Sequence, residues 1–255
     1  MKEVILHWHE EGYASIMLNR PNKLNSITPQ MTEDLHNALE EALKFEELKF
    51  LIVTGAGERA FCSGGDLNEL HGDLSADDAY QTLHPMKEVL LKLALFPVPT
   101  IAILNGIARG GGCEIATACD FRYGLADGEY GFVQANLGIC PGWGGGALLY
   151  KRILPVHAAL WLMQANLHKA EDTLHSGWLH KIITKSEIKG TEILKDFLNK
   201  TPAQLRWFKQ QYLSEINAAE LNRQMEQEVK QCASLWESEE HKQAVQNFLK
   251  TRKKS

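Results

Sequence analysis

The sequence predicts an α/β domain made of strand–helix units, and two observations support this prediction. Short apolar runs rich in β-branched residues recur along the chain, and stretches whose apolar residues have helical spacing lie between them. Two of the runs, residues 50–54 and 100–104, precede glycine-rich segments. In a layered domain, both glycine segments are therefore expected at one edge of the sheet.

The composition is that of an ordinary globular protein. The 255 residues suffice for one large domain, or for one domain with an appendage. Hydrophobic residues make up 44% and charged residues 23% of the chain. The net charge of −5, with no basic cluster larger than that at 250–254, argues against nucleic-acid binding as the main role. No apolar stretch approaches the about 20 residues of a membrane span, and residues 1–3 run directly into a strand pattern, so we expect neither a membrane span nor a secretory leader.

Cysteine and histidine usage indicates the compartment and argues against a metal centre. The five cysteines form no C-x-x-C pair and lie in apolar or glycine-rich surroundings, which predicts a reducing cytoplasm. His7 and His9 alternate on a predicted strand, while His175 and His180 flank a predicted helix end. Because neither pair has a third ligand in the pattern, surface or core positions are favoured over a metal site.

The elements follow from periodicity and capping signals. Residues 4–9 and 13–18 alternate around Glu11-Gly12 and predict a hairpin, and Pro29 suits the first position of a helix that Thr28 caps. The later chain predicts helices or short strands at 76–95, 121–123, 130–133, 142–152, 156–165, 170–176 and 179–183. Beyond about residue 187 only helices are expected, with apolar stripes over 205–219 and 221–232 and a last helix over 235–248.

The stretch from Asn105 to Asp120 has the pattern of a reactive site. It follows a buried strand, and the glycines at 110–112 allow a ligand to approach the backbone closely. The helix that begins there presents unpaired N–H groups and the positive end of its dipole, and Glu114 lies in its first turn. This arrangement would stabilise a negative oxygen beside an acid or base. Alternatively, Glu114 merely stabilises the helix N-terminus. The glycines do not fit the G-x-G-x-x-G dinucleotide pattern.

Five motifs together resemble the enoyl-CoA hydratase/isomerase family, also called the crotonase superfamily. They are Asn19-Arg20-Pro21 with Leu24-Asn25, the segment 60–67 (Ala-Phe-Cys-Ser-Gly-Gly-Asp-Leu), the segment 105–120, Ala118-Cys119-Asp120-Phe121-Arg122, and 137–145 (Leu-Gly-Ile-Cys-Pro-Gly-Trp-Gly-Gly). The resemblance covers roughly residues 4–185. It implies a spiral of ββα units over residues 1–186. Residues 187–255 would form a helical region that mediates trimerisation and covers the bound CoA. Trimers could then pair into hexamers. The alternative for this region is a helical cap folded on its own core.

The resemblance also assigns roles to individual residues. The N–H groups of Gly65 and Gly111 would form an oxyanion hole for a thioester carbonyl, beside Glu114 as acid or base. Preorganised donors of this kind can each be worth about 2.7–4 kcal/mol of barrier. The residues implied in CoA binding are Lys23, Leu24, Asp66, Leu67, Phe248 and Lys250. CoA is then part of the substrate, and no separate cofactor is expected.

One position departs from the family pattern. Hydratases of the family carry a second glutamate before the Leu-Gly-Ile-x-Pro-Gly turn, where this chain has Gln134. Hydration needs one group to take a proton from water and another to give one to the α-carbon, and an amide has no acidic proton to give. Isomerases of the family usually keep their single acid at the position of Gln134. Both assignments are weakened, that of isomerase more.

Decarboxylation of a short alkylmalonyl-CoA, such as methylmalonyl- or ethylmalonyl-CoA, fits the remaining groups, and the motifs look like the ethylmalonyl-CoA decarboxylase branch. Loss of CO2 forms the enolate without a base, and Glu114 would protonate the α-carbon.

Two further residues have two interpretations each. Arg109 would pair with the acyl carboxylate or face outward, and Trp143 would line the acyl pocket or belong to the core. The alternatives to decarboxylation are a 2-enoyl-CoA hydratase of fatty-acid β-oxidation, a non-catalytic protein of this fold that binds CoA, RNA or a partner, and another CoA reaction such as dehalogenation or hydrolysis.

Overall fold

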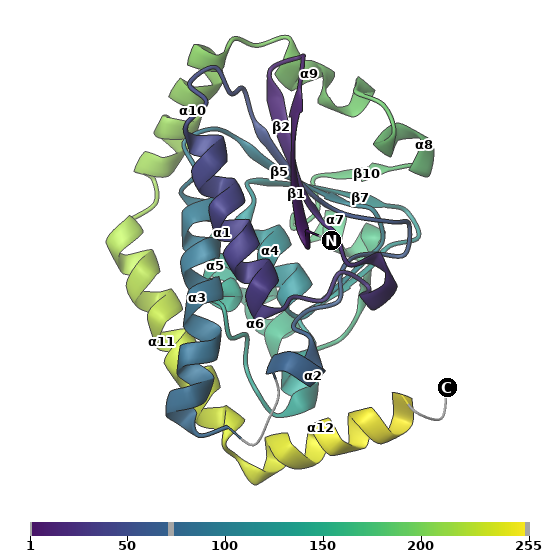
Figure 1. Ribbon diagram of the computed structural model, residues 1–255, viewed down its shortest axis with the longest axis vertical. Coiled ribbons are helices and arrows are strands. Elements are labelled where there is room, and N and C mark those ends of the chain that lie inside the picture. The colour runs from purple at the N-terminus through teal and green to yellow at the C-terminus, as the bar shows by residue number, and fades with distance from the viewer. Residues whose placement is uncertain (1, 71–73, 253–255) are drawn as a thin grey trace.

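Two sheets form the framework of the computed structural model, which describes residues 2–70 and 74–252 apart from a few side chains near residue 70 and near the C-terminus (Figure 1). The larger sheet has the strand order β1-β2-β3-β5-β7-β10, and the smaller has β4-β6-β8-β9. The strands are β1 Val4–His9, β2 Tyr13–Leu18, β3 Leu51–Gly55, β4 Ala60–Cys62, β5 Thr100–Leu104, β6 Ile107–Arg109, β7 Phe121–Leu125, β8 Glu129–Gly131, β9 His168–Lys169 and β10 Lys181–Ile183. β1 and β2 form the predicted antiparallel hairpin, and β2, β3, β5, β7 and β10 pair in parallel.

From β3 to β8, consecutive strands alternate between the two sheets, which confirms the spiral of ββα units. β3 continues into β4, β5 into β6 and β7 into β8, and helices follow each pair. The glycine segments directly follow β4 and β6, which pair in parallel. They therefore meet at one edge of the smaller sheet.

The helices cover the sheets and begin where the sequence supplies caps. They are α1 Pro29–Leu43, α2 Leu67–Leu70, α3 Ala76–Ala94, α4 Gly111–Ala118, α5 Gly145–Arg152, α6 Pro155–Gln164, α7 Ala170–His175, α8 Lys185–Ile188, α9 Lys195–Leu198, α10 Pro202–Ser214, α11 Ala218–Trp236 and α12 Glu239–Arg252, with 3-10 turns η1 Pro21–Lys23, η2 Gln134–Leu137 and η3 Glu192–Leu194. At α1, the Thr28 hydroxyl accepts from the Met31 N–H at 2.9 Å, and Pro29 occupies the first turn, as predicted. α1 and α3 pack side by side (Figure 1).

The described chain after β10 is helical, as expected beyond about residue 187, and folds back on the rest. α11 packs along α3 and α5. Its buried residues Leu221, Met225, Val229 and Cys232 belong to the same hydrophobic core as the strands. Nothing in this packing tests whether the region also mediates trimerisation, which stays a prediction.

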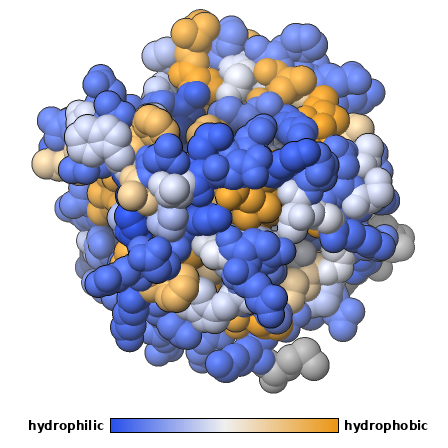
Figure 2. Space-filling view, turned by 90° about the horizontal axis from the view of Figure 1, so that it is seen from above, coloured by the Kyte–Doolittle hydropathy of each residue, from blue (hydrophilic) through white to orange (hydrophobic). Residues whose placement is uncertain are grey.

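α10 differs from α11, because much of its predicted apolar stripe reaches the surface. Leu205 is buried, but Phe208 is 57% and Tyr212 40% exposed. Figure 2 looks down on the end of the molecule where α10 lies in Figure 1, and apolar side chains interrupt the polar surface there.

Among the described residues, no helix is both long and apolar enough to cross a membrane.

Candidate active site

A cavity of about 900 Å³ lies where the two glycine segments meet η2, the loop before α5 and the C-terminal helices. Seven of the predicted site residues line it: Gly65, Leu67, Arg109, Gly111, Glu114, Gln134 and Trp143. The fold therefore brings together residues that are up to 78 positions apart in the chain (143 − 65). This convergence makes the cavity the candidate active site.

Two backbone N–H groups of the cavity wall are spare donors. In the described part of the chain, neither the Gly65 N–H nor the Gly111 N–H donates to a protein acceptor. The segments approach closely because Gly64 has φ +98°, and a Cβ on it would lie 3.1 Å from the Arg109 carbonyl oxygen and 3.3 Å from the Gly111 nitrogen. Two unpaired amides on adjacent loops can bind one oxygen anion.

Glu114 is buried beside these amides and is held by several hydrogen bonds. Its Oε2 accepts from the N–H groups of Trp143 and Gly145, both at 2.9 Å, and its Oε1 accepts from the Gln134 amide at 2.9 Å. Burial raises the pKa of the Glu114 carboxyl group, while these hydrogen bonds oppose the rise. An acid or base of fixed orientation, with its pKa moved toward neutrality, is suited to proton transfer.

The loop before α5 explains why that helix starts later than predicted. The pattern predicts a helix from 142, but α5 begins at Gly145, because Gly144 adopts φ +87°. The non-helical turn aims the Trp143 and Gly145 N–H groups at Glu114.

Gln134 and Arg109 each have one buried polar side-chain atom that makes no hydrogen bond within the described residues. These atoms are Gln134 Oε1 and Arg109 Nε. The Arg109 side chain is 39% exposed, and its Nη2 lies 3.4 Å from a carboxylate oxygen of Glu129 at the surface. Arg109 therefore stands at the rim of the cavity, with one face toward solvent and one toward the interior.

Trp143 limits the space beside Gly111. An added Cβ on Gly111 would lie 2.0 Å from the indole ring, so the ring rests directly on the helix N-terminus. Trp143 is 5% exposed and belongs to the core cluster as well as the cavity wall. Trp143 is therefore a core residue that also lines the cavity, and its contact with an acyl group stays a prediction.

Of the remaining predicted CoA-binding residues, the four whose side chains the structure describes do not line the cavity: Lys23, Leu24, Asp66 and Lys250. Asp66 is buried and pairs with Arg20 at 3.0 Å. Lys23 is exposed, and the Leu24 carbonyl accepts from the Ser63 N–H at 3.0 Å. Lys250 is exposed on α12, and the side chain of Phe248 is outside the described part. Their contacts with CoA stay predictions.

Sequence patterns did not identify the part of the wall formed by α3 and the C-terminal helices. Leu83, Cys232, Trp236 and Asn247 also line the cavity, and Cys140 does so from the loop before α5. Helical spacing of apolar residues indicated the buried faces of these helices, but no local signal says which distant site a helix will cover. In the part of the chain that the structure describes, no three His, Cys, Asp or Glu side chains are grouped so as to hold a metal ion.

Glu228 of α11 was also missed. Its carboxylate accepts from the N–H groups of Gly146 at 3.1 Å and Ala147 at 2.7 Å, the next donors after those that hold Glu114. The α5 N-terminus thus binds two carboxylates, one from α4 and one from α11. Burial raises the pKa of Glu228, and the nearby charge of Glu114 raises it further.

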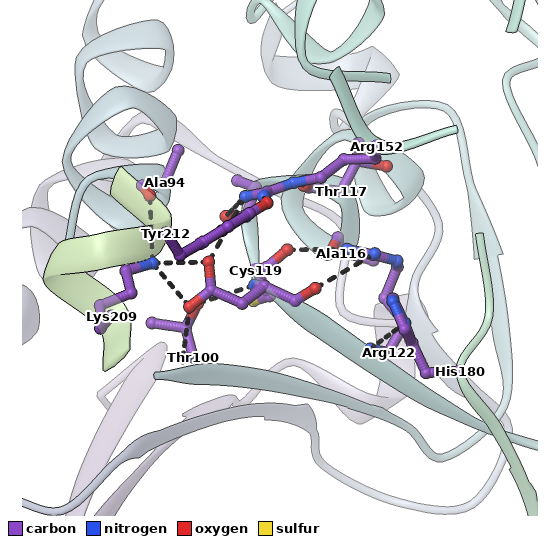
Figure 3. Close-up of polar contacts among 12 residues, drawn as sticks. Ala94, Thr100, Ala116, Thr117, Cys119, Arg122, Arg152, His180, Lys209 and Tyr212 are labelled. Atoms are coloured by element: carbon purple, nitrogen blue, oxygen red, sulfur yellow. Dashed lines mark hydrogen bonds and ion pairs between the residues drawn. The ribbon is translucent and has the colours of Figure 1, made fainter. Parts of the chain in front are cut away.

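The opposite end of α4 is closed by a buried charge cluster (Figure 3). Lys209 Nζ lies 2.5 and 2.6 Å from the carboxylate oxygens of Asp120, and Arg152 lies 3.6 Å from the same group. Thr100 donates to Asp120 through its N–H at 2.9 Å and its hydroxyl at 3.1 Å. Arg122 donates to the last carbonyls of the helix, including that of Cys119 at 2.7 Å. The cluster fixes the helix and ties α10 to it.

Comparison with known proteins gives a consistent picture. The model of the enoyl-CoA hydratase/isomerase family matches residues 9–255. An ethylmalonyl-CoA decarboxylase of Xenopus laevis is 34% identical over 178 residues, which are 70% of this chain but 59% of that protein. A short-chain-enoyl-CoA hydratase of Clostridium acetobutylicum is 28% identical over 99% of this chain and 97% of that protein. The crystal structure of an enoyl-CoA hydratase from Bacillus halodurans superposes with a TM-score of 0.86 at 23% identity, covering 96% of this chain and 99% of that one.

Proposed function

Because the chain belongs to the enoyl-CoA hydratase/isomerase family, we propose that it is an enzyme acting on acyl-CoA thioesters, and that its reaction is the decarboxylation of a short alkylmalonyl-CoA. The observation that carries this choice is the pairing of Glu114 with an amide, Gln134, at 2.9 Å. A second carboxylate would be expected there in a hydratase. Among the described residues, the side chains of the cavity wall include one carboxyl group, that of Glu114.

The proposed reaction uses groups whose positions are known. The bond between the α-carbon and the carboxylate breaks, CO2 leaves, and the electron pair moves into the thioester, whose oxygen becomes negative. The N–H groups of Gly65 and Gly111 stabilise that oxygen. The Glu114 carboxyl group then gives its proton to the α-carbon.

Charge also favours a carboxylated substrate. Two unit charges about 4 Å apart repel by about 4 kcal/mol at an effective dielectric constant of about 20. The amide of Gln134 removes one such repulsion, and the buried Nε of Arg109 offers a donor at the cavity rim. Trp143, resting on Gly111, favours a short acyl group such as methylmalonyl or ethylmalonyl.

The second candidate is hydration of a short 2-enoyl-CoA. It is favoured by the spare acceptor Gln134 Oε1, which can orient a water molecule, and by likeness to the Clostridium hydratase over nearly the whole chain. Glu114 would then have to act as both base and acid.

The decisive experiment incubates the purified protein with equimolar crotonyl-CoA, methylmalonyl-CoA and ethylmalonyl-CoA and follows each by mass spectrometry. We expect a malonyl thioester to lose the mass of CO2 and Glu114→Gln to lose most of this activity. A gain of water by crotonyl-CoA alone would establish the hydratase instead. If no thioester changes, a fluorescence titration with CoA and with RNA would test the third alternative, a binding protein.

We further propose that the protein assembles as a trimer or a dimer of trimers in the cytoplasm. Large apolar side chains are exposed on and beside α6, with Leu154 at 63%, Val156 at 68% and Met163 at 78%. Such a surface supports burial against a second copy. Light scattering should give a mass three or six times that of the 28.7 kDa chain, and Met163→Glu should lower it, whereas a monomer in the wild type would contradict the proposal.

A further inference from the structure

Two cysteines meet in the cavity wall although they come from distant parts of the chain. Cys140 lies in the loop before α5, and Cys232 lies on α11. The Cys232 thiol donates to the Cys140 carbonyl oxygen at 3.2 Å. Both residues belong to the cavity wall, and Cys140, which is partly exposed, is the one that a small molecule in the cavity can reach, because Cys232 is buried behind it.

The five cysteines fall into two classes. Cys62, Cys113, Cys119 and Cys232 are buried, and the pKa of each thiol is raised, by burial in the first three and by the Cys140 side chain and burial in Cys232. Cys140 is partly exposed, and contact with the Cys232 side chain lowers the pKa of its thiol. Because the thiolate is the reactive form, Cys140 should react first.

Charged and titratable groups surround the pair on several sides. Glu114 of α4 and Glu228 of α11 lie near it, and in their ionised forms they raise the pKa of the thiols and so oppose thiolate formation. The Cys140 thiol also lies 3.9 Å from the Glu228 carbonyl oxygen. Attack on a small neutral oxidant is therefore favoured over attack on an anionic one.

We propose that Cys140 and Cys232 form a reversible disulfide that inactivates the cavity, with hydrogen peroxide as the oxidant. The Cys140 thiolate attacks one peroxide oxygen, the O–O bond breaks, a sulfenic acid forms, and the hydroxide that leaves takes up the proton lost by the thiol to give the first water. The Cys232 sulfur then attacks that sulfur, loses its proton and releases water. Overall, two thiols and one peroxide give one disulfide and two waters, and a small thiol such as glutathione reverses the step.

The disulfide would act on the site through the loop that holds Glu114. Cys140 stands two and three residues before Gly142 and Trp143, whose N–H groups donate to the Glu114 carboxylate at 3.4 and 2.9 Å. Cys232 stands one turn before Trp236, which also lines the cavity. Drawing the two sulfurs into bonding distance moves this loop against α11, and Glu114 loses its fixed position.

The experiment treats the full-length reduced protein with hydrogen peroxide and maps its peptides by mass spectrometry. We expect a mass loss of about 2 Da, a Cys140–Cys232 linked peptide, and a fall from five to three free thiols after denaturation, all reversed by dithiothreitol. In Cys232→Ser the linked peptide should disappear, and Cys140 should stop at the sulfenic acid or proceed to the sulfinic acid. Oxidation in the wild type that leaves Cys140 as sulfinic acid, or a link between two chains, would overturn the proposal.

Two further measurements distinguish a failure of this inference from a failure of the proposed function. CoA added before peroxide should slow disulfide formation several-fold, a result that needs no turnover. Where a thioester is turned over, the ratio of activity before and after peroxide should be at least about tenfold in the wild type and near one in Cys140→Ser. If Cys140→Ser does not fold, the wild-type peptide map alone decides.

Discussion

The two ends of α4 differ in whether the polar groups around their buried charged side chains are all partnered. At the C-terminal end, the carboxylate of Asp120 is met by Lys209 and Arg152, and Arg122 satisfies the last carbonyls of the helix. At the N-terminal end, Glu114 is also held by hydrogen bonds, but the nearby amides of Gly65 and Gly111 lack acceptors within the described residues.

The difference separates structural from chemical roles within one short helix. Polar groups that are fully partnered fix the position of the helix and bind nothing further. Donors that face a cavity without acceptors are ready for a ligand. Burial of a charge therefore does not by itself mark a candidate active site, whereas a spare donor beside a buried carboxyl group does.

The largest effect is expected at the closed end. Asp120→Ala leaves Lys209 and Arg152 buried without their counter-ion and should lower the free energy of unfolding by about 3–5 kcal/mol. Chemical denaturation measures this. The matched control is Asp127→Ala, whose side chain is 72% exposed in an ion pair with Lys185, and it should change stability by less than about 1 kcal/mol. An equal loss of unfolding free energy in the two variants would contradict the assignment of a structural role to the buried cluster around Asp120.

At the open end, Gly111→Ala should damage activity. The added methyl group would lie 2.0 Å from the Trp143 ring, which must move and displace the amide beside it. Misplacement of this kind costs about 100-fold in kcat/KM. Gly190→Ala serves as the control, because a Cβ there meets nothing within 4 Å. Near-normal turnover by Gly111→Ala would exclude the Gly111 amide from the chemistry.

The smallest effect concerns His180, beside the closed end. Burial first, and then the charges of Arg122 and Arg152, lower the pKa of His180 to about 4 from an ordinary 6.5. Above pH 6.5 the histidine is neutral in both states, and its Nδ1 accepts the Arg122 N–H at 3.2 Å. As pH falls from 6.5 toward 4, the unfolded chain binds the proton first, so stability declines. His180→Asn, which keeps an acceptor, should flatten this decline in thermal unfolding measured at successive pH values. An unchanged slope would exclude His180 as its source.

Local signals in the sequence predicted much of the fold and the core of the site. The Thr28–Pro29 cap, the β1–β2 hairpin and the glycine segments each depend on neighbours in the chain, and each lies as predicted. The grouping of Glu114, Gln134 and the two amides followed from motif resemblance.

Long-range contacts escaped prediction for a physical reason. Glu228, Cys232 and Trp236 reach the site because α11 packs on α3 and α5, and no local pattern encodes which surface a helix will cover. Likewise, the start of α5 at Gly145 depends on Glu114, which lies 31 residues earlier.

The most direct test of the account compares two reactions in the wild type and in Gln134→Glu. The measured quantity is the ratio of kcat/KM for ethylmalonyl-CoA decarboxylation to that for crotonyl-CoA hydration. A second carboxylate beside Glu114 repels a carboxylated substrate and supplies the acid that hydration lacks, so the ratio should fall at least about tenfold. A ratio that stays the same would contradict the claim that the amide at position 134 selects the reaction.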